Sequence, residues 1–158
     1  MAFKTSGGTV GLPGFFCDLV RCETRLYNAV NDRLRERHGI VTPQFEALRY
    51  LRDHPGTRVA DVAAEFAVGI GSASKVVDRL EARGWAERQP NPSDRRSSLL
   101  ALTDDGRRLV DAAEVTFGER LAELIADAPG ALLVTAAAQA LSRLRSALER
   151  DQIGTPTG

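Results

Sequence analysis

Apolar residues recur at every third or fourth position in several stretches of the chain, which is the pattern of helices that bury one face. The first stretch starts at Phe15 and stops at Gly39, a residue that commonly ends helices. Its apolar positions are Phe15, Leu19, Cys22, Leu26, Val30 and Leu34. A second stretch opens at Thr42-Pro43, a capping residue followed by proline at the first helical position, and ends at His54-Pro55-Gly56. The pattern therefore predicts two helices before residue 56.

Two shorter amphipathic segments follow, separated by the turn Ala67-Val68-Gly69. The first has an apolar face made of Val59, Val62, Ala63 and Phe66. The second extends from about Gly71 to Arg83, with Ser72 as a candidate N-cap, and buries Ala73, Val76, Val77 and Leu80. Two short helices joined by a glycine-bearing turn form a helix-turn-helix pattern.

A hairpin is predicted next, because the runs Trp85–Arg88 and Leu99–Leu102 flank a polar tip rich in Pro, Asn, Ser and Arg. Thr103 then caps a new helix that carries Asp104 and Asp105 in its first turn, where the helix dipole favours acids. A hairpin that projects arginines behind a helix-turn-helix unit suits a protein that holds duplex DNA by two grooves at once.

Two further helices are predicted at the C-terminal end. One runs from Asp104 to about Ala126, with Leu109, Ala113, Phe117, Leu121 and Leu124 inward, and Pro129-Gly130 ends it. The last, over 131–150, has apolar residues at the alternating spacing of a helix–helix seam. Helices left with an unburied stripe normally pack against a second copy of the chain. We expect the dimer seam to contain Leu19, Leu26, Val134, Leu141, Leu144 and Leu148.

Composition narrows the class of protein. The chain has 158 residues and a formal net charge of zero, which excludes a globally basic nucleic-acid binder but not a local basic patch. The N-terminus lacks the apolar core of a signal peptide, and no run approaches the length of a membrane span, so we expect a cytoplasmic protein. No Cys/His cluster has metal-ligand spacing, and no catalytic or nucleotide-binding motif appears, so we expect no enzyme activity, metal or cofactor.

The candidate DNA contacts lie on the second helix of the helix-turn-helix pattern and on the hairpin. Ser72, Ser74, Lys75 and Arg79 face away from the predicted core, and hydroxyls and cations suit both base edges and phosphates. An ordinary solvated helix face is the alternative, and for Arg79 the two interpretations are nearly even because Asp78 or Glu81 could pair with it.

On the hairpin the candidates are Arg88, Arg95 and Arg96, since a narrow minor groove attracts arginine. The alternative is a loop that is charged only for solubility. Asp94 argues against this for one arginine, because a carboxylate two residues away can hold a guanidinium in a fixed direction. Arg95 is expected to contact phosphate or to be merely solvated.

The segments Leu80-Glu81-Ala82-Arg83-Gly84 and Asp94-x-Arg96, followed by Leu102-Thr103-x-x-Gly106, together resemble the MarR family of bacterial transcriptional regulators. The resemblance extends over about residues 13–150. It implies a homodimer whose two winged helix-turn-helix lobes bind a pseudo-palindrome in double-stranded DNA, with Arg96 in the minor groove and Asp94 orienting it. It also implies a repressor released by a small-molecule effector, in a cleft between the dimer helices and the DNA lobes. The residues expected near that cleft are Tyr27, Arg49 and Tyr50.

The predicted fold is mainly α with a small β-hairpin wing, a winged helix-turn-helix with N- and C-terminal dimerisation helices. Residues 42–103 form the DNA-binding lobe, and residues 13–41 and 104–150 form the dimerisation helices. Residues 1–12 and 151–158 are expected to be a flexible N-terminus and a flexible tail.

Two other functions stay open. A winged helix can serve as a protein–protein interaction module without binding DNA, since fold does not determine function. The resemblance also extends to peroxide-sensing members, in which a reactive cysteine occupies the place of Cys17. Asn31 and Thr42 stand where the supporting tyrosines of those members are expected, which disfavours this function. Cys22 falls on the apolar stripe, so we expect it to be a small buried hydrophobe.

Overall fold

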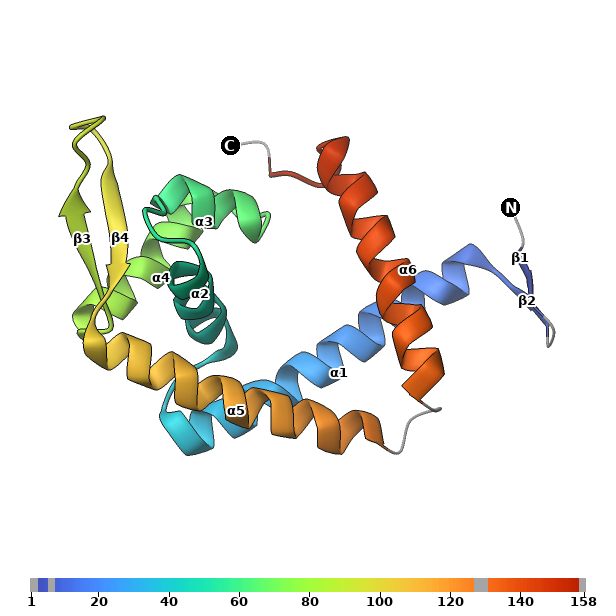
Figure 1. Cartoon of the computed structure of the whole chain (residues 1–158). Helices are drawn as coiled ribbons and strands as arrows, with labels where there is room; N and C mark the ends of the chain where they lie inside the picture. The colour runs from blue at the N-terminus through green and yellow to red at the C-terminus, as the bar shows by residue number, and fades with distance from the viewer. Residues whose placement is uncertain (1–2, 6–7, 127–130, 157–158) are drawn as a thin grey trace.

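The computed structural model describes residues 3–5, 8–126 and 131–156. It is mainly helical with a projecting two-stranded wing, which confirms the predicted fold class (Figure 1). The elements in chain order are β1 (Phe3–Thr5), β2 (Gly8–Val10), α1 (Leu12–His38), α2 (Thr42–Asp53), α3 (Val59–Glu65), α4 (Ile70–Ala82), β3 (Ala86–Pro90), β4 (Ser98–Leu102), α5 (Asp104–Ala126) and α6 (Ala131–Arg150).

The end of α1 lies where the sequence predicts it, whereas the start of α2 has a different cap from the one predicted. Gly39 ends α1 in the left-handed conformation, with φ of 65°, and its N–H donates to the carbonyl of Arg35. Thr42 is the first helical residue of α2 and not its cap. The N-cap is Val41, whose N–H donates to the side-chain oxygen of Gln44 at 3.1 Å. A side chain three residues along therefore performs the capping expected of the threonine.

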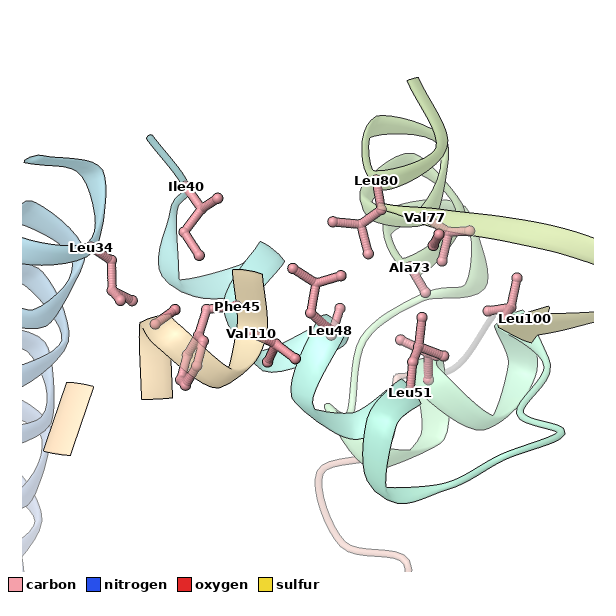
Figure 2. Close-up of a cluster of buried hydrophobic side chains, with 14 of the residues drawn as sticks. Leu34, Ile40, Phe45, Leu48, Leu51, Ala73, Val77, Leu80, Leu100 and Val110 are labelled. Carbon is pink, nitrogen blue, oxygen red and sulfur yellow. The ribbon is translucent and has the colours of Figure 1, made fainter. Parts of the chain in front are cut away.

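A single core joins α2 and α4 to the end of α1, to the wing and to α5 (Figure 2). Phe45 of α2 is fully buried, and its ring lies 4.9 Å from the ring of Phe117 on α5. His38 near the end of α1 shares a 2.8 Å hydrogen bond with the buried Thr116 of α5. The largest fully buried residues are Phe45, Leu34, Ile40, Leu48, Leu80, Leu100, Val77, Val110 and Thr42. This core holds the helix-turn-helix against the long helix.

The wing is anchored to the lobe at its base. Its strands pair antiparallel from Ala86 opposite Leu102 to Pro90 opposite Ser98. The N–H of Leu100 donates to the carbonyl of Thr57 at 2.7 Å, which ties β4 to the segment before α3. The wing is thus a rigid extension of the lobe at its base.

The junction of the wing and α5 explains the Leu-Thr-x-x-Gly segment. As predicted, Thr103 caps α5, because its hydroxyl accepts from the N–H of Gly106 at 3.1 Å and donates to the carbonyl of Gly84 at 2.7 Å. A Cβ on Gly106 would lie 1.9 Å from the carbonyl oxygen of Trp85, so no larger residue fits there. This glycine allows the close approach of α5 to the base of the wing.

The N-terminal half of α1 and the whole of α6 leave apolar residues uncovered. α6 stands apart from the DNA-binding lobe in Figure 1. Its residues Val134, Leu141, Leu144 and Leu148 are between 37% and 43% exposed in the single chain. Such a row of half-exposed leucines is more than one globular chain normally shows to water.

The chain ends differ in part from the sequence analysis. Residues 3–10, in the stretch expected to be flexible, include the short antiparallel pair β1–β2. Pro129-Gly130, predicted to separate the last two helices, lies outside the described residues. None of the helices that the structure describes combines the length and the apolar composition needed to cross a bilayer.

Candidate nucleic-acid interface

Helix α4 presents a polar, cationic face away from the core. Ala73, Val77 and Leu80 are buried, whereas Lys75 and Arg79 are exposed one turn apart. Neither cation has an ion-pair partner within the described ranges. Ser72 is also exposed, and Ser74 is half-buried. The predicted set of outward residues therefore lies on one surface of the helix, available to a ligand.

The N-terminus of α4 has no side-chain cap, which corrects the expectation for Ser72. The N-cap is Gly69, whose carbonyl accepts from the N–H of Ser72 at 2.9 Å, so Ser72 lies inside the first turn. Uncapped amide groups at a helix N-terminus attract anions such as phosphate. Ser72, which does not serve as a cap, is exposed in the same turn.

The tip of the wing exposes two arginines. Arg95 and Arg96 are both exposed, and the described residues contain no ion pair to either. Asp94 does not hold the Arg96 guanidinium in this structure. Its carboxylate accepts from the backbone N–H of Arg96 at 2.9 Å, so it shapes the turn. The sequence analysis expected the Asp94 carboxylate to hold the Arg96 guanidinium, but it binds the backbone N–H, because that donor is the nearer one for a carboxylate two residues away.

Arg88, predicted as a DNA contact on the wing, forms ion pairs with α4 in this structure. Its guanidinium lies 2.8 Å from Asp78 and also pairs with Glu81, and its backbone N–H donates to Glu81 at 3.1 Å. These are the acids that the sequence analysis considered as partners of Arg79. Arg88 therefore fastens the wing to α4, and Arg79 has no ion-pair partner among the described residues.

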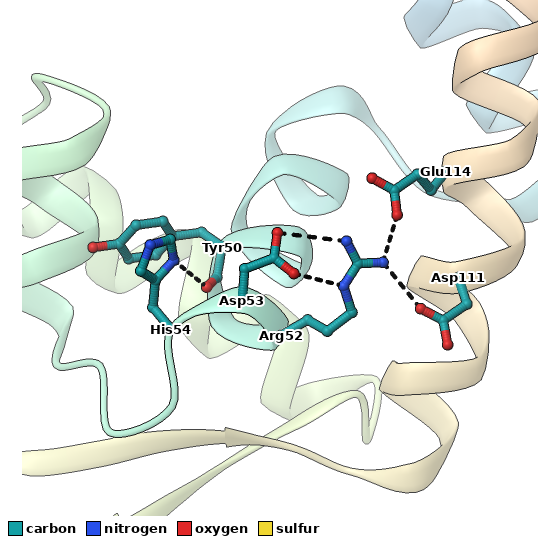
Figure 3. Close-up of polar contacts among 6 residues, drawn as sticks. All are labelled: Tyr50, Arg52, Asp53, His54, Asp111 and Glu114. Atoms are coloured by element: carbon teal, nitrogen blue, oxygen red, sulfur yellow. Dashed lines mark hydrogen bonds and ion pairs between the residues drawn. The ribbon is translucent and has the colours of Figure 1, made fainter.

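A second charged cluster, which the sequence analysis missed, joins α2 to α5 (Figure 3). Arg52 of α2 pairs with Asp53 at 2.8 Å, with Asp111 at 3.0 Å and with Glu114 at 2.6 Å. The hydrogen bonds that Arg52 donates to these carboxylates, the one to Glu114 foremost, raise the pKa of Arg52, and the bond to Asp53 lowers the pKa of that carboxyl group. Because the acids of α5 lie about sixty residues away in sequence, no local pattern signals this contact.

Two adjoining cavities lie between the lobe and the helices α1 and α5. The first, which we call the dimer-side cavity, has a volume of about 390 Å³ and includes one residue of α6. Its lining residues are Leu19, Cys22, Glu23, Leu26, Tyr27, Val30, Thr42, Glu46, Phe117, Leu121 and Leu141. The second, the lobe-side cavity, measures about 270 Å³ and reaches α4. Its lining residues are Tyr27, Pro43, Glu46, Ala47, Val62, Phe66, Val68, Ser72, Ala73 and Val76.

The predicted effector residues do not share one cavity. Tyr27 lines both cavities, but Arg49 and Tyr50 line a third, polar one of about 370 Å³ together with Asp53 and His54. Arg49 instead covers the ring of Phe117, with its guanidinium carbon 5.5 Å from the ring centre. Tyr27 belongs to α1, whereas Arg49 and Tyr50 belong to α2, and the two helices place them on different cavities.

The cysteines are both free and exposed in the single chain. Cys22 was expected to be buried, but it is exposed and lines the dimer-side cavity. The reason is that the apolar stripe of α1 extends past the end of the core. Asn31 and Thr42 contact each other, with the backbone N–H of Thr42 donating to the side-chain oxygen of Asn31 at 3.1 Å. The two residues at the expected tyrosine positions are thus tied together.

Comparison with known proteins agrees with this geometry. The model of the MarR family matches residues 40–98. The multiple antibiotic resistance protein MarR of Escherichia coli K12 is 31% identical over 104 residues, which cover 61% of this chain and 72% of that protein.

Solved structures are similar over most of the chain. The transcriptional repressor CouR bound to a 23-mer DNA duplex has a TM-score of 0.76 at 25% identity, over 85% of this chain and 92% of that one. CouR from Rhodococcus jostii RHA1 bound to p-coumaroyl-CoA has a TM-score of 0.67 at 28% identity, over 89% and 91% of the two chains.

Proposed function

Because this chain belongs to the MarR family and is a DNA-binding transcriptional regulator, we propose that it is a ligand-responsive repressor that acts as a homodimer on a pseudo-palindromic operator. The observation that carries the proposal is the surface shared by α4 and the wing. Lys75 and Arg79 on the helix, and Arg95 and Arg96 on the wing tip, are exposed cations without acidic partners within the described part of the chain.

These groups suit two kinds of contact. The outward face of α4, with Ser72, Ser74 and Lys75, has the small hydroxyls and the cation that major-groove edges and phosphates accept. Arg96 extends from a wing whose base is held by Arg88, so it can enter the adjacent minor groove without loss of order in the lobe. An interaction module would present an apolar face on α4, and the polarity of this face argues against that alternative.

The proposed dimer rests on the uncovered residues of α1 and α6. Leu141 of α6 lines the same cavity as Leu19 and Leu26 of α1, so the predicted seam residues of the two helices border one apolar surface. A second copy that covers this surface would place two wings at a fixed separation, as a two-fold operator requires. Residues 42–103 then form the reading lobe, and residues 13–41 and 104–150 hold the dimer.

The repressor and effector roles are supported by relatives. CouR is described as a repressor and as bound to p-coumaroyl-CoA. In this chain the cavities between α1, α2 and α4 offer a site from which a bound molecule would touch the recognition helix.

The test is DNA binding by the purified protein. Fluorescence anisotropy compares a duplex from the promoter next to its own gene with a random duplex of equal length, at near-physiological salt. We expect clear preference for the promoter, one dimer per site, half-sites about one helical turn apart, and a steep loss of affinity as salt rises. Equal affinity for both duplexes would refute the proposal.

A further inference from the structure

The charge of the two cavities is entirely negative. Glu23 and Glu46 are their only charged lining residues, and none of the described lining residues is Lys, Arg or His. Arg49, whose guanidinium carbon lies 5.4 Å from the ring centre of Phe45, lines neither of them, although it lines the polar cavity that Glu46 also borders. An anionic ligand would therefore meet repulsion in these two cavities without a cation in their lining.

Glu46 is the central group, because it lines both cavities. It is half-buried and makes no hydrogen bond or ion pair with any residue that the structure describes. Burial raises the pKa of Glu46, opposed by Arg49 and assisted by Glu23. Burial, together with the charges of Glu46 and Glu23, also raises the pKa of the neighbouring Tyr27. An unpaired carboxylate in an apolar wall is stabilised most by a cation that donates hydrogen bonds.

The remaining lining is apolar and fits a hydrophobic group. Around Glu46, the lobe-side cavity offers Pro43, Val62, Phe66 and Val76, none of which belongs to the proposed seam. Cavities of this size that combine apolar walls with a few polar groups are typical of small-molecule sites.

We propose that the lobe-side cavity binds a lipophilic amine, with its ammonium group at Glu46 and its apolar body against Val62, Phe66 and Val76. This inference rests on the proposed function, since it names the class of effector. A ligand at Glu46 also borders Ser72, Ala73 and Val76 of α4, so it would be in direct contact with the helix that we propose for DNA recognition. Glu23, exposed at the other side of the dimer-side cavity, adds a weaker attraction that solvent screens.

Three probes of equal shape test the charge. 4-Phenylbutylamine, 4-phenylbutanol and 4-phenylbutyrate share an aryl chain and are positive, neutral and negative at pH 7. Isothermal titration calorimetry on the full chain is expected to give amine binding about tenfold tighter than the alcohol, with the carboxylate weakest. Glu46→Gln removes the preference for the amine over the alcohol while the apolar walls remain. Glu119→Gln, an exposed carboxylate on α5, serves as the matched control and keeps the preference.

Three results would overturn the inference: the carboxylate binds as tightly as the amine, Glu46→Gln retains the preference, or none of the probes binds. Promoter binding is measured on the same preparation without probe. A protein that binds its promoter but no amine refutes the ligand class alone, and one that binds the amine but shows no promoter preference refutes the proposed function alone. Release of the promoter by the amine, at the concentrations that saturate the calorimetric site, completes the case for an effector.

Discussion

Arg88 and Arg96 both belong to the wing, and the structure predicts that their removal has opposite consequences. The Arg88 side chain is 30% exposed and pairs with Asp78 and Glu81. Partly exposed ion pairs contribute about 0.2–1 kcal/mol each. Arg88→Ala also leaves the Glu81 carboxylate, which is 28% exposed, without its partner. We expect the free energy of unfolding to fall by about 1–2 kcal/mol.

Arg96→Ala should have the opposite pattern of effects, with weaker DNA binding and unchanged stability. Arg96 is exposed and has no ion pair within the part of the chain that the structure covers, so Arg96→Ala should change stability by less than about 0.5 kcal/mol. If Arg96 neutralises a phosphate or lies in the minor groove, its loss weakens promoter binding and reduces the slope of log affinity against log salt by about 0.9 per contact. Arg88→Ala should leave that slope unchanged.

Urea unfolding followed by circular dichroism measures the stabilities. Fluorescence anisotropy measures the salt slopes between roughly 50 and 200 mM salt, where the loss of phosphate contacts changes the affinity strongly. Arg37→Ala, which removes an exposed arginine near the end of α1, serves as the charge-matched control and should affect neither quantity appreciably. The reasoning fails if Arg88→Ala lowers the salt slope as much as Arg96→Ala does, or if it leaves stability intact.

Four further predictions concern other parts of the molecule. Leu144→Glu places a charge in the expected dimer seam. We expect the variant to sediment as a monomer and to lose promoter binding. If the variant sediments as an intact dimer, the seam lies elsewhere. Lys75→Ala should weaken promoter binding in anisotropy without a change in thermal stability. Arg52→Met should lower the free energy of unfolding by about 1–2 kcal/mol in urea, because three carboxylates lose their shared cation. Arg52 lowers the pKa of Asp53 in the folded state, so their pairing stabilises the fold above the unfolded-state pKa near 3.9. This stabilisation is lost as the pH falls through the folded-state pKa of Asp53. The stabilities of the parent and of Arg52→Met should therefore converge at low pH in an acid titration. Cys17→Ser should leave promoter binding unchanged before and after mild organic peroxide; release of the parent alone would identify a sensor.

The order and type of the elements from α1 to α6 were predictable from the sequence, because helices and hairpins are governed by local periodicity and by a few end signals. Gly39 ended α1, and Thr103 capped α5, where the pattern placed them. The helix-turn-helix and the wing followed from spacing alone. Even the failures at local level were small: Val41 stands in place of Thr42 at the cap, and its N–H donates to the side chain of Gln44.

The partners of charged residues were decided only by the tertiary structure. The sequence could not tell that Arg88, and not Arg79, would occupy Asp78 and Glu81, since both lie within reach of the same acids along the chain. The Arg52 cluster and the unpaired Glu46 depend on which face of α2 meets α5 and which meets the cavities. Electrostatic contacts form between side chains that folding brings together from distant positions, whereas hydrophobic periodicity records only that a residue is buried. The sequence by itself thus determined the helices, the wing and the exposed cationic surface that we propose for DNA binding, and the packing of α1, α2 and α5 decided which charges hold the lobe and which remain free for a ligand.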